Sequence, residues 1–141
     1  MNVLVAYDAS EGAEEALRFA ARLTTPEGAL IVLHVINPTT DAGDIEAPTR
    51  TEAVAILRAR LEAAMEERLA PMVEPKPEGI VAEVDRGEDV AECIDRIATE
   101  RGVDAVAIAS RRAAGLRGLA LGSITQELLR ISARPVVVVR A

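Results

Sequence analysis

Residues 109–140 read ASRRAAGLRGLALGSITQELLRISARPVVVVR, and they carry the strongest pattern in the chain. It begins as the end of a strand and continues as a basic loop that contains glycine. A helix then opens at Gly122-Ser123, and four valines, Val136–Val139, form a closing strand. The first backbone N–H groups of a helix have no partner within the helix. The start of this helix is therefore a candidate anion site.

Four other short apolar runs, rich in β-branched residues, precede this stretch at residues 3–6, 29–36, 80–82 and 105–109. Unbroken apolar runs of this length are typical of strands buried on both faces of a parallel sheet. Together with the closing valines, they predict five strands.

Segments with helical spacing separate the predicted strands, because their apolar residues recur every three or four positions. Ser10 and the pair Thr49 and Glu52 are suitable caps for the first two helices, and Ser123 with Gln126 forms a further capping-box pattern. The four apolar stripes are Ala13, Ala16, Leu17, Ala20 and Leu23; Val54, Leu57, Leu61, Ala64 and Met65; Val90, Ile94 and Ile97; and Leu121, Ile124, Leu128 and Ile131. Strands and helices that alternate in this way predict a three-layer α/β fold with a five-stranded parallel sheet.

Composition limits the class of protein. The chain has 141 residues, which suits one domain over residues 1–141 with a substantial core. A formal net charge of −7 argues against a nucleic-acid partner. The single cysteine, Cys93, excludes an internal disulfide, and we interpret it as core filler. No signal peptide is visible and no apolar run is long enough to cross a membrane, so we expect a cytoplasmic protein without a membrane partner.

Well-known phosphate motifs are missing. The only lysine, Lys76, does not lie in a glycine-rich loop, so a P-loop is excluded. The sequence Asp8-Ala9-Ser10-Glu11-Gly12 follows the first strand in place of G-x-G-x-x-G, which disfavours a dinucleotide Rossmann site.

The sequence also disfavours hydrolytic and metal-dependent chemistry. His34 is the only histidine and lies inside an apolar run, so we interpret it as a satisfied structural residue and not as a catalytic base. One histidine and one cysteine cannot supply a metal site rich in nitrogen and sulfur, so no metal ligands are predicted.

A receiver-type phosphoacceptor domain is a rival interpretation, because it shares this kind of sheet. It would use an aspartate after the third strand, where Asp85 stands. It would also have a lysine after the fifth strand and a closing helix. Here the fifth strand is followed by Arg140-Ala141, so this interpretation fails on two counts.

Six motifs occur in a fixed order along the chain: Val5-Ala6-Tyr7-Asp8-Ala9-Ser10, Leu33-His34-Val35, Arg86-Gly87, residues 104–110 (DAVAIAS), Leu121-Gly122-Ser123 and residues 134–140 (RPVVVVR). In these motifs the chain resembles the universal stress protein family over essentially its whole length. The resemblance implies a doubly wound sheet of the adenine nucleotide alpha hydrolase-like type, with strand order 3-2-1-4-5. It also implies a role in stress tolerance and homodimers that often pair through the last strand.

Many members of this family bind ATP at the carboxyl ends of the central strands, which is where open α/β sheets generally bind ligands. Their pattern is G-x2-G-x9-G-S/T. Counting back from Gly122-Ser123 places Ala109 and Arg112 at the first two glycines, so both glycines are substituted. The resemblance assigns Asp8 and Val35 to the flanks of adenine, and Ile124 and Thr125 to the phosphates.

The two substitutions differ in their physical effect. Ala109 adds one methyl group, which is tolerable unless the backbone needs a left-handed conformation. Arg112 either blocks the phosphate path with its long side chain or binds phosphate through its planar guanidinium. Arg111 and Arg117 make the same loop basic, either as phosphate ligands or as charges that face solvent or a partner.

We therefore favour a regulatory stress protein without robust catalysis, in which ATP binding is weak or lost. The alternative is a member that binds ATP with Mg²⁺ and uses it for partner control or slow hydrolysis. Asp8 is the only evident general base, so no enzyme is predicted. The apolar edge Val136–Val139 would pair with a second copy of the chain, and any other protein partner stays unidentified.

Overall fold

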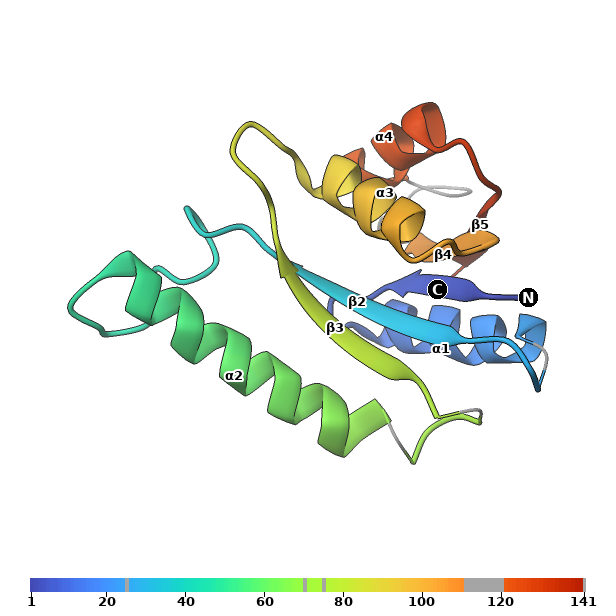
Figure 1. Cartoon of the computed structure of the whole chain (residues 1–141), viewed down its shortest axis with the longest axis horizontal. Coiled ribbons are helices and arrows are strands. Elements are labelled where there is room, and N and C mark those ends of the chain that lie inside the picture. The colour runs from blue at the N-terminus through green and yellow to red at the C-terminus, as the bar shows by residue number, and fades with distance from the viewer. Residues whose placement is uncertain (25, 70, 75, 111–120, 141) are drawn as a thin grey trace, which may run out of the picture.

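Parallel strands form one sheet in the order β3-β2-β1-β4-β5 (Figure 1). The computed structural model describes residues 1–24, 26–69, 71–74, 76–110 and 121–140. In these residues the strands are β1 (Val3–Ala6), β2 (Leu30–Ile36), β3 (Glu78–Glu83), β4 (Ala105–Ser110) and β5 (Val136–Arg140). The helices are α1 (Glu11–Leu23), α2 (Arg50–Leu69), α3 (Val90–Glu100) and α4 (Ser123–Ile131). The predicted fold class is confirmed.

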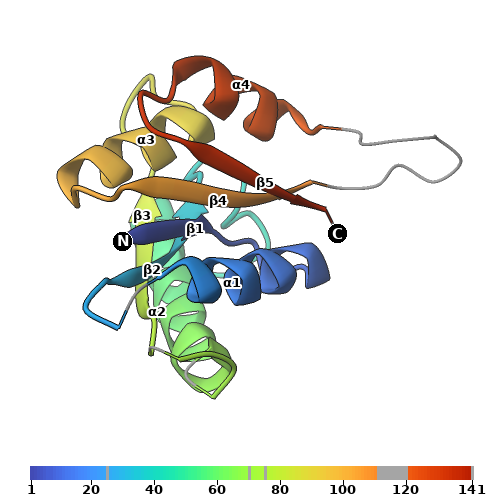
Figure 2. The ribbon, with the colours of Figure 1, turned by 90° about the vertical axis from the view of Figure 1, so that its right-hand side faces the viewer.

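The helices cover the two faces of the sheet, with α3 and α4 above it and α1 and α2 below it in Figure 2. Strand β1 lies at the centre, where Val3 pairs with Leu30 of β2 and with Ala105 of β4. Side chains alternate between the faces of a strand, so each strand contributes to two cores. One core packs β1 and β2 against α1 and α2. The other packs Leu4 and the neighbouring strands against α3 and α4.

Helix starts follow the predicted caps in two places and depart from them in a third. The Ser10 hydroxyl accepts a hydrogen bond from the N–H of Ala13 at 3.1 Å, and that of Thr49 accepts from Glu52 at the same distance. The predicted capping box of α4 is wrong. Gly122 is its N-cap and makes no side-chain cap bond, because Ser123 already lies one residue inside the helix. The Gln126 amide donates instead to the Leu121 carbonyl at 2.8 Å.

Helix α3 carries a capping box that the sequence analysis did not identify. The Asp89 carboxylate accepts from the N–H of Glu92 at 2.8 Å, and the Glu92 carboxylate accepts from the N–H of Asp89 at 3.2 Å. The two residues therefore satisfy each other's free backbone donors at the start of the helix.

Arginine side chains cover the free edge of β3. The N–H of Val84 donates to the Ile36 carbonyl, so the alternation of a parallel ladder turns the carbonyls of Val81 and Glu83 away from β2. Arg58 of α2 donates to the Val81 carbonyl, and Arg96 of α3 donates to that of Glu83 at 3.4 Å. Two acceptors that another chain could use at this edge are therefore already occupied.

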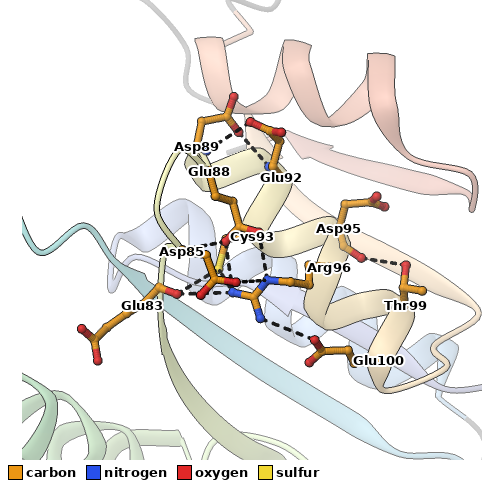
Figure 3. Close-up of polar contacts among 10 residues, drawn as sticks. All are labelled: Glu83, Asp85, Glu88, Asp89, Glu92, Cys93, Asp95, Arg96, Thr99 and Glu100. Atoms are coloured by element: carbon orange, nitrogen blue, oxygen red, sulfur yellow. Dashed lines mark hydrogen bonds and ion pairs between the residues drawn. The ribbon is translucent and has the colours of Figure 1, made fainter.

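Arg96 also holds the loop between β3 and α3 (Figure 3). Its guanidinium binds both oxygens of Glu88, at 2.8 and 3.0 Å, and lies 3.3 Å from an oxygen of Asp85. Cys93 lies next to this guanidinium and is fully buried, with its sulfur 3.8 Å from the Glu83 carbonyl oxygen. Burial raises the pKa of the Cys93 thiol to about 11, which suits the predicted role of core filler.

The capping box of α3 leads to a stability prediction. Asp89→Ala should lower the free energy of unfolding by about 1 kcal/mol, because the N–H of Glu92 loses its acceptor. Urea denaturation followed by circular dichroism measures this change. Asp89→Asn is the matched control, since asparagine also caps helices, and it should retain most of the stability. Equal losses in the two variants would contradict the capping role.

Candidate functional site

A cavity of about 1100 Å³ opens at the carboxyl ends of the strands. The ends of β1, β2 and β4 and the starts of α1 and α4 contribute to its lining. The chain leaves β1 toward β2 on one side of the sheet, and β4 lies on the other side of β1. The cavity thus lies at the topological switch point, where open α/β sheets bind their ligands.

The structure brings the described members of the predicted site around this one cavity. Each comes from a strand end or from the start of α4, and they are Asp8, Val35, Ala109, Gly122, Ser123, Ile124 and Thr125. Arg112, the remaining predicted site residue, lies outside the described residues, as do Arg111 and Arg117. The binding role of these residues remains a prediction.

The start of α4 faces the cavity with unpaired backbone donors. Gly122 is the cap, and no described residue accepts a hydrogen bond from the N–H groups of Ser123, Ile124 or Thr125. The N-terminus of a helix carries a partial positive charge. This element can therefore bind an anion without a charged side chain.

The loop between β1 and α1 contains a strained residue. Ala9 has φ of 66°, and it is the only described non-glycine residue in the left-handed region. This conformation costs about 1–2 kcal/mol. The Asp8 carboxylate stabilises the turn by accepting a hydrogen bond from the N–H of Ser10 at 3.0 Å. This strain could not be predicted from the sequence, because alanine gives no signal for a left-handed conformation.

Ala109 lies in β4 and has no positive φ. Its backbone therefore does not need glycine for conformational reasons. The substitution at this position adds one methyl group to the cavity wall and no backbone strain.

The cavity is acidic where it is described. Its lining includes the carboxylates of Asp8, Glu11 and Asp41, and no lysine or arginine among the described residues. No three His, Cys, Asp or Glu side chains in the described ranges come close enough together to hold a metal ion. These carboxylates would thus repel an anionic ligand. Among the described residues, the start of α4 would attract it.

His34 differs from the hydrogen-bonded core histidine that the sequence predicted. It lies in β2 as expected, but its side chain is half-buried and lines the cavity. Its ring meets that of Tyr7 edge-on, with 6.4 Å between centroids and an angle of 74°. It forms no hydrogen bond with a described residue. Burial lowers the pKa of its imidazole, and the charges of Asp8 and Asp41 offset part of that effect.

The sequence analysis also missed the cavity residues Tyr7, Asp41, Leu57 and Leu61. Tyr7 could have been found, because it directly precedes Asp8 at the end of a predicted strand. The two leucines have the spacing of an ordinary core stripe, and only the placement of α2 brings them to the cavity.

Across the residues that the structure describes, no helix combines the length and apolarity needed to cross a bilayer.

The lowered pKa of His34 predicts a pH-dependent stability. Its ordinary pKa is about 6.5, so on acidification the unfolded chain takes up a proton before the folded chain does. The stability due to neutral His34 is present above that pKa and is lost as the pH falls below it. The melting temperature of the wild type should fall more between pH 7.5 and 5.5 than that of His34→Gln. Equal falls would show that the histidine pKa is not lowered by folding.

Comparisons with known proteins agree with this architecture. The profile of the universal stress protein family matches residues 1–140. Similar solved structures include hypothetical protein MJ0577, with 27% identity, TM-score 0.70 and coverage of 99% of this chain and 95% of that one. Universal stress protein UspA from Lactobacillus plantarum has 19% identity and TM-score 0.75, with coverage of 99% and 97%.

The universal stress protein from Archaeoglobus fulgidus in complex with dAMP has 23% identity and TM-score 0.64, with coverage of 99% and 97%. Curated proteins yielded no match. Because the family profile extends over nearly the entire sequence, the chain belongs to the universal stress protein family.

Proposed function

We propose that the chain is a regulatory stress-tolerance protein that acts as a homodimer, lacks robust catalysis, and binds ATP weakly or not at all. One observation carries the proposal. Seven residues at the positions of the family's nucleotide site surround one cavity at the switch point of the sheet, although two glycines of the motif are replaced. The dimer would act on a protein partner that is not identified.

Adenine nucleotides are the ligand class that this cavity suits best. The structure of the Archaeoglobus fulgidus relative holds dAMP. Here Leu33, Val35 and Ile108 belong to one apolar cluster and line the cavity, and the start of α4 with its free N–H groups also lines it. An apolar base and an anionic phosphate would each meet a suitable surface.

Charge and volume both argue for weak binding of ATP. A triphosphate carries three or four negative charges into a cavity whose described lining holds three carboxylates. Arg112 stands where the family pattern has glycine, and a long side chain at that position would narrow the phosphate path. A monophosphate would meet less repulsion than ATP would.

Robust catalysis has little support in this geometry. The Asp8 carboxylate is already engaged by the N–H of Ser10. His34 belongs to the face of β2 opposite Val35, so it lies across the sheet from the proposed adenine position. Neither group is thus well placed to activate water at a phosphate bound by α4.

The alternative is an ATP-binding protein with nucleotide-dependent partner control or slow hydrolysis. The free N–H groups of Ser123, Ile124 and Thr125 favour it, since they could hold a phosphate. Mg²⁺ would have to accompany the nucleotide, because it would neutralise phosphate charge beside the carboxylates of the cavity.

Calorimetric titration with Mg-ATP tests the proposed weakness. The wild type should bind with a dissociation constant of tens of micromolar or poorer, which is about 6 kcal/mol of binding or less. Ala109→Gly with Arg112→Gly should tighten binding by restoring room for the phosphates. Ala109→Gly alone is the control and should change little. Tight binding by the wild type that is lost in the double variant would make Arg112 a phosphate ligand and contradict the steric account.

The proposed dimer rests on the open edge of β5. The N–H of Val106 donates to the Pro135 carbonyl at 3.0 Å, so ladder alternation turns the backbone groups of Val136 and Val138 away from β4. No described side chain forms a hydrogen bond with these groups, in contrast to the arginines at β3. Val136–Val139 are also only partly buried. A second copy in antiparallel register would satisfy both the backbone and the valines.

Val138→Pro tests this pairing, because it removes an N–H that points out of the sheet and leaves the bonds to β4 in place. Two-fold symmetry would remove two hydrogen bonds, roughly 2 kcal/mol in total, so dimerisation should weaken about thirtyfold. Val138→Thr keeps both the shape and the N–H and should remain dimeric. Sedimentation velocity measures the association. A wild type that sediments as a monomer at micromolar concentration would contradict the proposal.

A further inference from the structure

We propose that the part of the cavity between α1 and α2 is a second binding site, which takes an uncharged small molecule with an apolar body and one group that both donates and accepts a hydrogen bond. It is separate from the nucleotide position. Its main residues are Tyr7, His34, Leu57 and Leu61.

The alternation of side chains along β2 separates the two sites. Val32 and Ile36 pack into the core under α1 and α2, and Leu33 and Val35 pack into the core under α3 and α4. His34 therefore shares the face of Val32 and Ile36. A ligand beside His34 lies on the opposite side of the sheet from a base beside Val35.

The placement of α2 leaves an apolar wall open. Arg58 ties the helix to β3 through the Val81 carbonyl and through Glu83, at 2.6 Å. Arg68, ten residues later, ties it to Glu14 of α1 at 2.6 Å. Leu57 and Leu61 lie near the first of these contacts, and they stay only partly buried while they line the cavity. Two aliphatic side chains thus have apolar surface available for a ligand.

His34 supplies the polar group of this site. Every described side-chain nitrogen or oxygen that is cut off from solvent has a hydrogen-bond partner. The imidazole nitrogens of His34 have no partner among the described residues, so they are accessible to solvent, and His34 lines the cavity. A neutral imidazole offers one N–H donor and one acceptor nitrogen. A ligand hydroxyl can donate to one and, from the same oxygen, accept from a donor nearby.

The surroundings of His34 select against both kinds of charged ligand, an anion through repulsion by the neighbouring carboxylates and a cation through the loss of its hydration. Asp8 and Asp41 line the same cavity as His34, so their carboxylates would repel an anionic head group there. The Asp41 carboxylate already accepts from the N–H of Asn37 at 2.7 Å and from the Thr40 hydroxyl at 3.1 Å, which reduces its capacity to bind a cation. A cation would also lose hydration beside the two leucines. An uncharged head avoids both costs.

Phenol is a suitable probe, because it joins a flat apolar ring to one hydroxyl. His34 is the only histidine in the chain, so its ring-proton NMR signals report on this site alone. Titration with phenol should shift these signals to saturation, with a dissociation constant on the order of 1 mM. Benzoate and benzylammonium carry the same ring with opposite charges, and each should bind at least about tenfold more weakly. Benzoate is repelled by the carboxylates, and benzylammonium loses hydration beside the two leucines. AMP at saturation should leave the phenol affinity unchanged.

Two variants separate binding from folding. Leu61→Gln makes the wall polar and should weaken phenol at least about fivefold, whereas Ala63→Gln on the exposed side of α2 should not. Both should keep the wild-type circular dichroism spectrum. Absence of a saturable His34 shift in the folded wild type would overturn the proposal, as would equal affinity in the two variants. Tighter binding of benzylammonium would replace the uncharged class with a cation, and competition by AMP would show a single site.

Discussion

The central strand β1 is buried on both faces, and this burial determines how the other elements are arranged. Val3, Leu4 and Val5 are completely inaccessible to solvent, and β1 pairs with β2 on one side and β4 on the other. Parallel neighbours can be reached only by crossovers, so helices must cover both faces of the sheet. The same arrangement sends consecutive connections in opposite directions from β1. The cavity at the carboxyl ends follows from this divergence and needs no special sequence of its own.

The strands in the middle of the sheet could be predicted from sequence, because a strand buried on both faces must be apolar throughout. The edge strand β3 shows the limit of that argument. The apolar run predicted residues 80–82, but the strand is Glu78–Glu83, since an edge position tolerates Glu78, Gly79 and Glu83. The contacts of Arg58 and Arg96 at this edge join residues 13 to 25 positions apart. Local patterns carry no information about such contacts.

The candidate site also has one part that could be predicted from the sequence and one part that could not. Residues at strand ends and at the start of α4 could be predicted, because the topology alone places those positions together. The α1–α2 side could not be. Leu57 and Leu61 have the spacing of ordinary core residues, and their partial exposure depends on where Arg58 and Arg68 hold α2. His34 was expected to be satisfied because its neighbours in sequence are apolar. Its side chain instead lines the cavity, and this exposure depends on how the helices pack on the sheet.

The two edges of the sheet differ in the contacts of their outward carbonyls, and this difference bears on the proposed dimer and the cavity. At β3 the outward carbonyls of Val81 and Glu83 are bound by arginines, whereas at β5 no described side chain binds those of Val136 and Val138. Strand β5 pairs with β4 so that Val139 stands beside Ala109, and the Ser110 hydroxyl donates to the Val139 carbonyl at 3.4 Å. Ala109 and Ser110 both line the cavity. A second chain added to β5 would thus lie one strand away from the residues of β4 that form part of the cavity wall.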